Sequence, residues 1–152
     1  MKWGYSQEIL HTGKKTKYKM KNLPLIFSAV IVGIILFQSV LVAPAINKLI
    51  NTIDASTFLR FIWPKFFVII AIISLASFIL MIINGHPNLY KYFSFISFLL
   101  MLSCYLITPL INEAKDSLNE QLWTILHLST IILTLLTLIL NVVIILWWKS
   151  TN

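Results

Sequence analysis

The sequence predicts an all-α integral membrane protein folded as an up-down four-transmembrane-helix bundle. Of its 152 residues, 59% are hydrophobic and 11% are charged, whereas soluble domains carry about 25% charged residues. The mean hydropathy is +0.88, and four apolar stretches each approach the roughly 20 residues that a helix needs to cross a bilayer. Because backbone amides in hydrocarbon must be hydrogen-bonded within the protein, these stretches are predicted as helices.

The four predicted spans cover about residues 23–46, 61–83, 90–111 and 122–148. The first begins at Leu23-Pro24, where proline is tolerated because first-turn amides lack helical partners. The second ends at Asn84-Gly85-His86-Pro87, a strong helix terminator. The fourth carries tryptophans at both ends, as is typical of membrane–water interfaces.

Short connections are expected at residues 47–60, 84–89 and 112–121, so that neighbouring spans run antiparallel. The predicted domains are a basic juxtamembrane tail, 1–22, and a single membrane domain, 23–149.

The basic tail is expected to meet anionic lipid headgroups, through Lys14, Lys15, Lys17, Lys19 and Lys21. No nucleic-acid motif accompanies these lysines, and no nucleic-acid partner is expected. With an even number of spans, eight basic residues share the side of the termini and four the other side. This count predicts cytoplasmic termini, in a bacterial-type cytoplasmic (inner) membrane. Counted from Met20, the tally is three against four and favours neither side.

An internal repeat is predicted at an offset of 65 residues. Residues 40–47, VLVAPAIN, match residues 105–112, YLITPLIN. The same offset carries the first two spans onto the last two, which would make the bundle two pseudo-repeated helical hairpins. Chance matching of apolar segments is the alternative.

Polar side chains recur at helical spacing within the third and fourth spans and are expected to face the bundle interior. They are Ser94, Ser97, Met101, Cys104 and Thr108 in the third span, and Thr124, His127, Thr130, Thr134, Thr137 and Asn141 in the fourth. Close packing with interhelical hydrogen bonds is one interpretation. A polar path or ligand groove is the other.

His127 and Gln38 are the polar side chains within the spans that most need an explanation. His127 lies about five residues into its span, roughly 8 Å of helical rise, hence near the headgroups. An interfacial hydrogen bond is the simpler interpretation, with ligand binding or proton handling as alternatives. Gln38 is interpreted in the same way, as a contact between helices.

No cofactor is expected. His11 and His86 lie outside the spans on the side opposite His127, so a second axial haem ligand at matching depth is missing. A metal site would join His127 to acids of the last connection, which is a weak signal. No phosphate-binding loop, zinc-protease helix or nucleophile elbow is present in the sequence, so no enzyme activity is predicted.

The side opposite the termini concentrates polar residues and prolines. The candidate functional positions there and within the spans are His127, Gln38, Pro44, Asn47, Pro109, Asn112, Thr134 and Asn141. The first connection with Lys65 has a net charge of +2 and the last has −2. These charges could pair across the bundle, or each could simply be solvated.

Four short motifs together resemble the transmembrane protein 205-like family of uncharacterised four-helix membrane proteins. They are Val42-Ala43-Pro44-Ala45, Phe61-Ile62-Trp63-Pro64-Lys65-Phe66-Phe67, Pro109, and Leu126-His127-Leu128-Ser129, across about residues 24–148. The family often has a Trp-x-Gly-Gly-like element where this chain has Ile31-Val32-Gly33. The resemblance implies a fold and a membrane location but no established activity, and it adds Ser129 to the candidate positions.

The predicted function is therefore that of a non-enzymatic structural or accessory membrane component. It would act through helix contacts with other membrane subunits or with further copies of itself. One alternative is the handling of a small molecule or ion along the polar face of the fourth helix. The other is a haem- or metal-binding oxidoreductase centred on His127.

Overall fold

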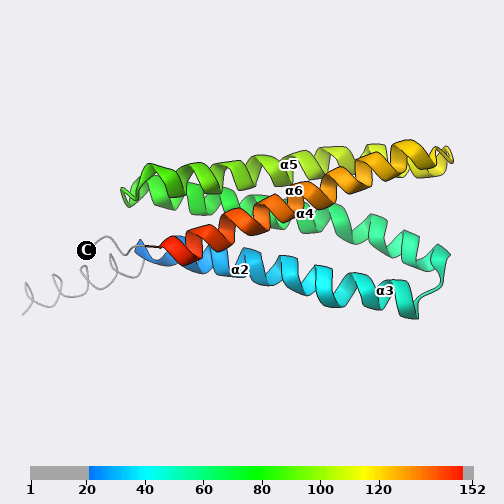
Figure 1. Cartoon of the computed structure of the whole chain (residues 1–152), viewed down its shortest axis with the longest axis horizontal. Helices are drawn as coiled ribbons and strands as arrows, with labels where there is room; N and C mark the ends of the chain where they lie inside the picture. The colour runs from blue at the N-terminus through cyan, green and yellow to red at the C-terminus, as the bar shows by residue number, and fades with distance from the viewer. Residues whose placement is uncertain (1–20, 149–152) are drawn as a thin grey trace, which may run out of the picture.

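Four long apolar helical segments pack antiparallel in the computed structural model, which describes residues 21–148 apart from the side chains of residues 52 and 53 (Figure 1). The first segment is α2 (Leu23–Phe37), the π-helix η1 (Gln38–Val42) and α3 (Ala43–Leu49), and the others are α4 (Thr52–Ile83), α5 (Asn88–Asp116) and α6 (Glu120–Trp147). Each segment is long and apolar enough to cross a membrane. The predicted all-α bundle is confirmed, and the chain is an integral membrane protein.

The prediction of a connection at residues 47–60 is wrong, because most of these residues are helical. Helix α3 continues to Leu49 and α4 begins at Thr52, which leaves Ile50 and Asn51 between them. The Asn51 side chain caps α4 by accepting a hydrogen bond from the Asp54 amide at 3.0 Å. Hydropathy shows where the apolar stretch stops, whereas the cap decides where the helix begins.

Two helices end in the same hydrogen-bonded motif, in which the residue after the cap is left-handed. After α4, Gly85 has φ 68° and the His86 amide donates to the Met81 carbonyl at 3.0 Å, as expected of a terminator. After α5, Leu118 has φ 56° and the Asn119 amide donates to the Ala114 carbonyl at 2.9 Å. The predicted third span therefore extends to Asp116 and is followed by a tight turn.

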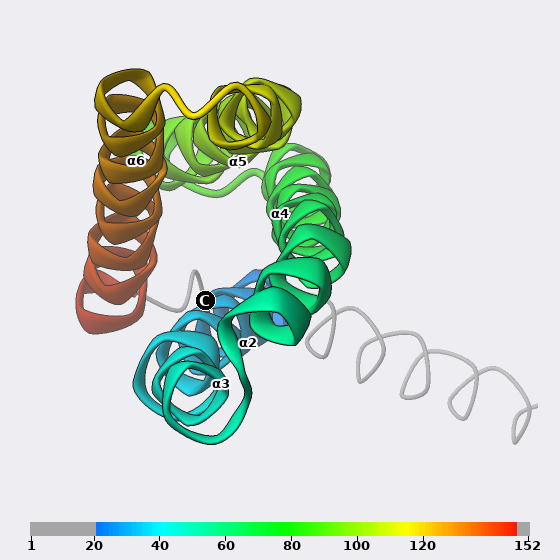
Figure 2. The ribbon, with the colours of Figure 1, turned by 90° about the vertical axis from the view of Figure 1, so that its right-hand side faces the viewer.

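The helices form a ring that is closed at one end only. Helix α4 packs against α2 and α5, α5 packs against α6, and α6 crosses over to pack against α2 near its own C-terminal end (Figure 1). Within the described chain, α3 packs on η1 and α4 but makes no contact with α6. Viewed from the end that carries α3, these two helices stand apart (Figure 2).

The polar faces of α5 and α6 turn into the bundle, as predicted. The five α5 positions from Ser94 to Thr108 are all buried, as are Thr130, Thr137 and Asn141 in α6. The Asn141 amide donates to the Ser97 hydroxyl at 3.1 Å and thereby joins the two helices. Thr124 differs, because its side chain is exposed and bonds to the Glu120 carbonyl of its own helix.

The two halves of the predicted repeat have different backbones at their prolines. Before Pro44 the chain forms η1, where the Ala43 amide reaches five residues back to the Gln38 carbonyl. Proline has no amide hydrogen and its ring clashes with the carbonyl four residues back, and a π-turn widens the helix at such a point. Pro109 lies within the continuous helix α5. The repeat therefore remains a prediction from sequence.

His86 ties three segments together at the closed end of the ring. It is 1% exposed, its Nε2 donates to the Lys21 carbonyl at 3.0 Å, and its ring lies 4.7 Å from the ring of Trp148. The Tyr90 hydroxyl donates to the Trp147 carbonyl nearby. Burial holds the pKa of His86 below its usual 6.5, and the charges of Lys21 and Lys91 add to this effect although the hydrogen bond to Lys21 opposes it.

Acidification is expected to destabilise the fold through His86. Because its pKa is lower in the folded chain, the unfolded chain binds more protons below about pH 6.5. The stabilising contribution is complete above that pH and is lost as the pH falls through it. Between about pH 7.5 and about pH 5, the midpoint temperature of thermal unfolding in detergent should fall more for the wild type than for His86→Gln. Equal falls in the two proteins would contradict this role.

Replacing Leu118 by glycine should stabilise the protein. Leu118 is 81% exposed and left-handed, a conformation that costs an L-residue roughly 1–2 kcal/mol. Glycine also makes the unfolded chain more flexible, which offsets part of the gain from removing this cost. The free energy of unfolding is therefore expected to rise by about 0.5–1 kcal/mol. Ser117→Gly is the matched control, because Ser117 has φ −82° and donates to the Ala114 carbonyl. The control should be destabilised in the same unfolding assay.

Candidate functional site

A cleft of about 790 Å³ lies in the half of the bundle where α3 and α6 stand apart. All four helical segments contribute to its walls. Its volume falls within the roughly 300–1,000 Å³ of small-molecule sites. In this half the ring of helices is open between α3 and α6 (Figure 2).

The outer end of the cleft, near the α3–α4 and α5–α6 turns, carries the charged and amide side chains of the lining, beside the apolar Ile50, Ala55, Leu59 and Ile111. Polar and aromatic side chains there come from all four segments, and we call them the polar end: Asn47, Arg60, Trp63, Asn112, Lys115, Trp123 and His127. Within the described chain, the side-chain amides of Asn47 and Asn112 make no hydrogen bond. They are therefore available to a ligand, as donors and as acceptors.

The inner end of the cleft is apolar. Its walls are hydrophobic side chains from α2, α4 and α6, which we call the apolar end: Ile35, Leu36, Phe67, Leu135 and Leu138. Phe67 stacks on Trp63 with ring centroids 5.7 Å apart, which joins the two ends along one wall. Hydroxyl groups line the cleft as well, but that of Thr134 already donates to the Thr130 carbonyl at 2.7 Å.

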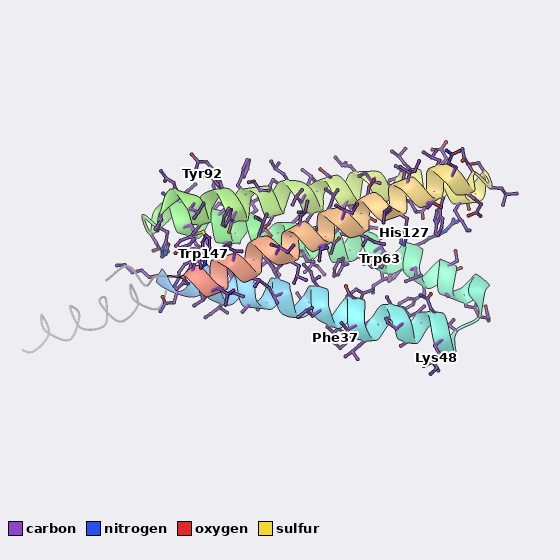
Figure 3. The ribbon with its side chains drawn as sticks, in the orientation of Figure 1. Phe37, Lys48, Trp63, Tyr92, His127 and Trp147 are labelled. Carbon is purple, nitrogen blue, oxygen red and sulfur yellow. The ribbon has the colours of Figure 1, made fainter. Side chains whose placement is uncertain are left out.

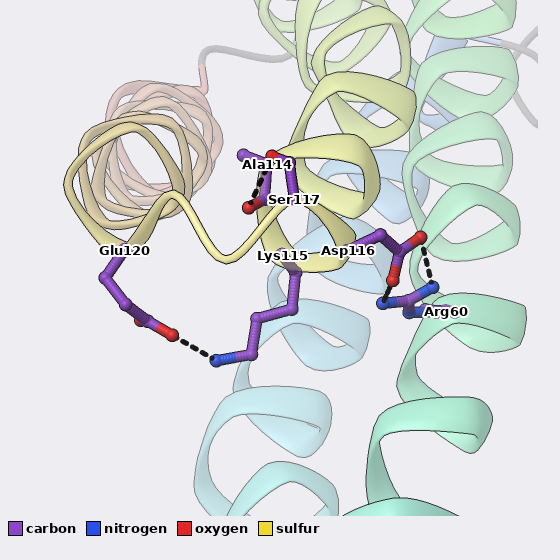
Figure 4. A network of polar contacts seen from close by, with 6 residues as sticks. All are labelled: Arg60, Ala114, Lys115, Asp116, Ser117 and Glu120. Atoms are coloured by element: carbon purple, nitrogen blue, oxygen red, sulfur yellow. Dashed lines mark hydrogen bonds and ion pairs between the residues drawn. The ribbon is translucent and has the colours of Figure 1, made fainter.

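Two ion pairs fix the cations of the polar end (Figure 4). Arg60 of α4 makes a two-pronged contact with Asp116 of α5, with nitrogen–oxygen distances of 3.0 and 2.5 Å. Lys115 contacts Glu120 across the α5–α6 turn at 3.0 Å. The Arg60–Asp116 pair joins the two oppositely charged regions whose pairing across the bundle was one of the two interpretations of the sequence.

His127 belongs to a stack of three side chains at the polar end. Its ring lies parallel to that of Trp123, with centroids 5.2 Å apart and 7° between the planes. The Lys115 ammonium lies 4.7 Å from the centroid of Trp123, a favourable cation–π distance. His127 and Trp63 approach the cleft from α6 and α4 (Figure 3).

Four of the nine candidate positions line this cleft, namely Asn47, Asn112, His127 and Thr134. The other five do not. Gln38 and Asn141 are buried between helices, Ser129 bonds to the Ile125 carbonyl of its own helix, and Pro44 and Pro109 are exposed. Lys14 to Lys19 lie outside the described residues.

Arg60, Trp63, Lys115 and Trp123 were not among the candidates, although all four line the cleft. The signal for Arg60 was present in the opposite charges of the two connections. Interfacial position alone was an adequate explanation for Trp123, and Trp63 entered only as part of a motif of the resemblance.

Comparisons with known proteins give no relative. No family model, no curated protein and no solved structure matches the chain. The resemblance to the transmembrane protein 205-like family therefore remains a prediction. Among the described residues, no group of three or more His, Cys, Asp or Glu side chains is placed to hold a metal ion.

Cysteine labelling should report the cleft directly, because Cys104 is the only cysteine of the chain and is completely buried. In a Cys104→Ala background, Thr134→Cys should react with a small water-soluble methanethiosulfonate, since Thr134 lines the cleft. Thr137→Cys, one turn further along α6 and 0% exposed, should react at least about tenfold more slowly, because attack requires an accessible thiolate. Equally slow reaction of both cysteines would show that the cleft is closed to solvent.

Proposed function

We propose that this protein binds a lipid-like amphiphile, with the apolar chain in the apolar end of the cleft and the headgroup at the polar end. The observation that carries the proposal is the polarity gradient along one cleft inside a membrane-spanning bundle. A small ion needs no long apolar wall. A purely apolar guest would make no use of the amides of Asn47 and Asn112, which line the same cleft.

The lengths of the helices support this orientation. Helix α4 has 32 residues, or roughly 48 Å, against a hydrocarbon core of about 30 Å. The surplus includes the polar turns before Arg60, whereas Phe67 lies seven residues further along the same helix. The polar end then lies at headgroup depth, and the apolar end lies within the hydrocarbon layer.

The gap between α3 and α6 supports lateral entry from the bilayer. Apolar side chains of α2 and α6 that line the cleft are also exposed, including Leu36, Ile131 and Leu135. An acyl chain moving through this gap exchanges one apolar surrounding for another. The headgroup can remain near water throughout, because the polar end is at the outer end of the cleft.

The accessory role predicted from the sequence draws support from a different surface. Phe61 is 62% exposed and Leu106 is 62% exposed, away from the cleft lining. Such faces suit lipid or a partner subunit equally. In both roles the protein acts by binding rather than by catalysis, and the count of lysine and arginine from Met1 supports cytoplasmic termini.

Filling the cleft tests the binding role. Thr134→Phe places a ring in the cleft, whereas the matched Ile132→Phe places one on an outer surface of α6 that is already 49% exposed. Native mass spectrometry with added dodecylglycerol, an uncharged amphiphile, should detect one retained molecule on the wild type and on Ile132→Phe. Apparent affinity should fall at least about tenfold for Thr134→Phe, because overpacking removes the space for the chain. Equal retention by both variants would show that the amphiphile binds outside the cleft.

A further inference from the structure

We infer that the amphiphile bound in the cleft carries an anionic headgroup, a phosphate or a carboxylate, held between Arg60 and Lys115. This inference rests on the proposed function and adds the chemical class of the ligand. It is carried by the placement of the charges at the polar end.

The cleft wall itself is cationic. Among the described residues that line the cleft, Arg60 and Lys115 are the only charged side chains, and the carboxylates that pair with them, Asp116 and Glu120, are not part of the lining. The side chains of Asp116 and Glu120 are 64% and 63% exposed, against 36% and 44% for Arg60 and Lys115. The positive groups therefore face the cleft and the negative groups face water.

Both cations keep donors for a ligand. Arginine has five N–H donors and lysine has three, and the ion pairs use two of those of Arg60 and one of those of Lys115. The free amides of Asn47 and Asn112 add N–H donors at the same end. Phosphate and carboxylate oxygens are the acceptors that such a set of donors suits best.

The two acids serve as counter-ions on the water side of the site. Exposed ion pairs contribute little, so an anion inside the cleft can share each cation without a large loss. An acid that competes for the cation should weaken binding of that anion. Removing the acid and removing the cation therefore have opposite predicted effects, and a merely structural role of the pair would not produce opposite effects.

The experiment measures affinity for four probes with the same chain, namely dodecyl phosphate, dodecanoate, dodecylphosphocholine and dodecylglycerol, by competition in an uncharged detergent. The wild type should bind dodecyl phosphate or dodecanoate at least about tenfold more tightly than dodecylphosphocholine and dodecylglycerol. A tenfold difference in affinity corresponds to about one hydrogen bond to a charged group. The two anionic probes distinguish a phosphate headgroup from a carboxylate. Inorganic phosphate should not compete, since it lacks the chain.

Variants assign the effect to the cations. Lys115→Gln and Arg60→Gln should each lose about tenfold in affinity for the anionic probe with no change for dodecylglycerol. Lys48→Gln is the matched control, because Lys48 is exposed on α3 and does not line the cleft. Asp116→Asn, which breaks the same pair as Arg60→Gln, should increase affinity for the anionic probe.

The outcomes separate the two proposals. If dodecylglycerol binds in the cleft but the anionic probes show no preference, or if Asp116→Asn and Arg60→Gln both weaken binding, the anionic ligand is ruled out and the binding role stands. Competition by inorganic phosphate equal to that of dodecyl phosphate would also overturn a lipid-like anion. Failure of every probe to bind in the cleft would overturn both.

Discussion

The need to satisfy backbone hydrogen bonds within lipid governs this structure. A helix in a bilayer cannot stop where its sequence becomes less apolar, and must continue until a cap supplies partners for its terminal amides and carbonyls. Asn51 does so for α4, and left-handed residues at Gly85 and Leu118 do so after α4 and α5. Helices α4, α5 and α6 are therefore longer than the roughly 20 residues that a span needs, and the polar end of the cleft lies near the turns that join them.

Closure of the ring at one end only follows from the path of α6. Near its C-terminal end α6 packs on α2, where His86, Tyr90 and the last tryptophans join the segments. At the other end α6 begins directly after the turn at Leu118 and stays beside α5. Helix α3 has only η1 and α4 as neighbours in the described chain, and the space left between α3 and α6 is the cleft.

The fold could be predicted because length and hydropathy determine which segments span a membrane. The interior positions of α5 could be predicted because Ser94, Ser97 and Cys104 follow helical spacing. The cleft could not be predicted, because nearly every face of these helices is apolar and periodicity does not distinguish a face against lipid from one against a void. His127 was visible from sequence as an unusual residue, and Arg60 only as one charge of the first connection. Their shared location depends on crossing angles that the sequence does not specify.

Polar residues within the bundle divide into three groups by their partners, the third being buried groups without a hydrogen-bond partner in the described chain, including the Ser28 and Ser74 hydroxyls and the Gln38 side-chain nitrogen. Asn141 and Ser97 bond to each other, and the hydroxyls of Thr134 and Thr137 bond to carbonyls of their own helix, so these groups are satisfied by the protein alone. Asn47 and Asn112 have no such partner in the described chain, and both lie at the end of the cleft that Arg60 and Lys115 make cationic. Interhelical packing explains the first group completely. Asn47 is exposed and Asn112 is half-buried, so their amides are open to water and, in the function proposed above, to the polar head of a ligand.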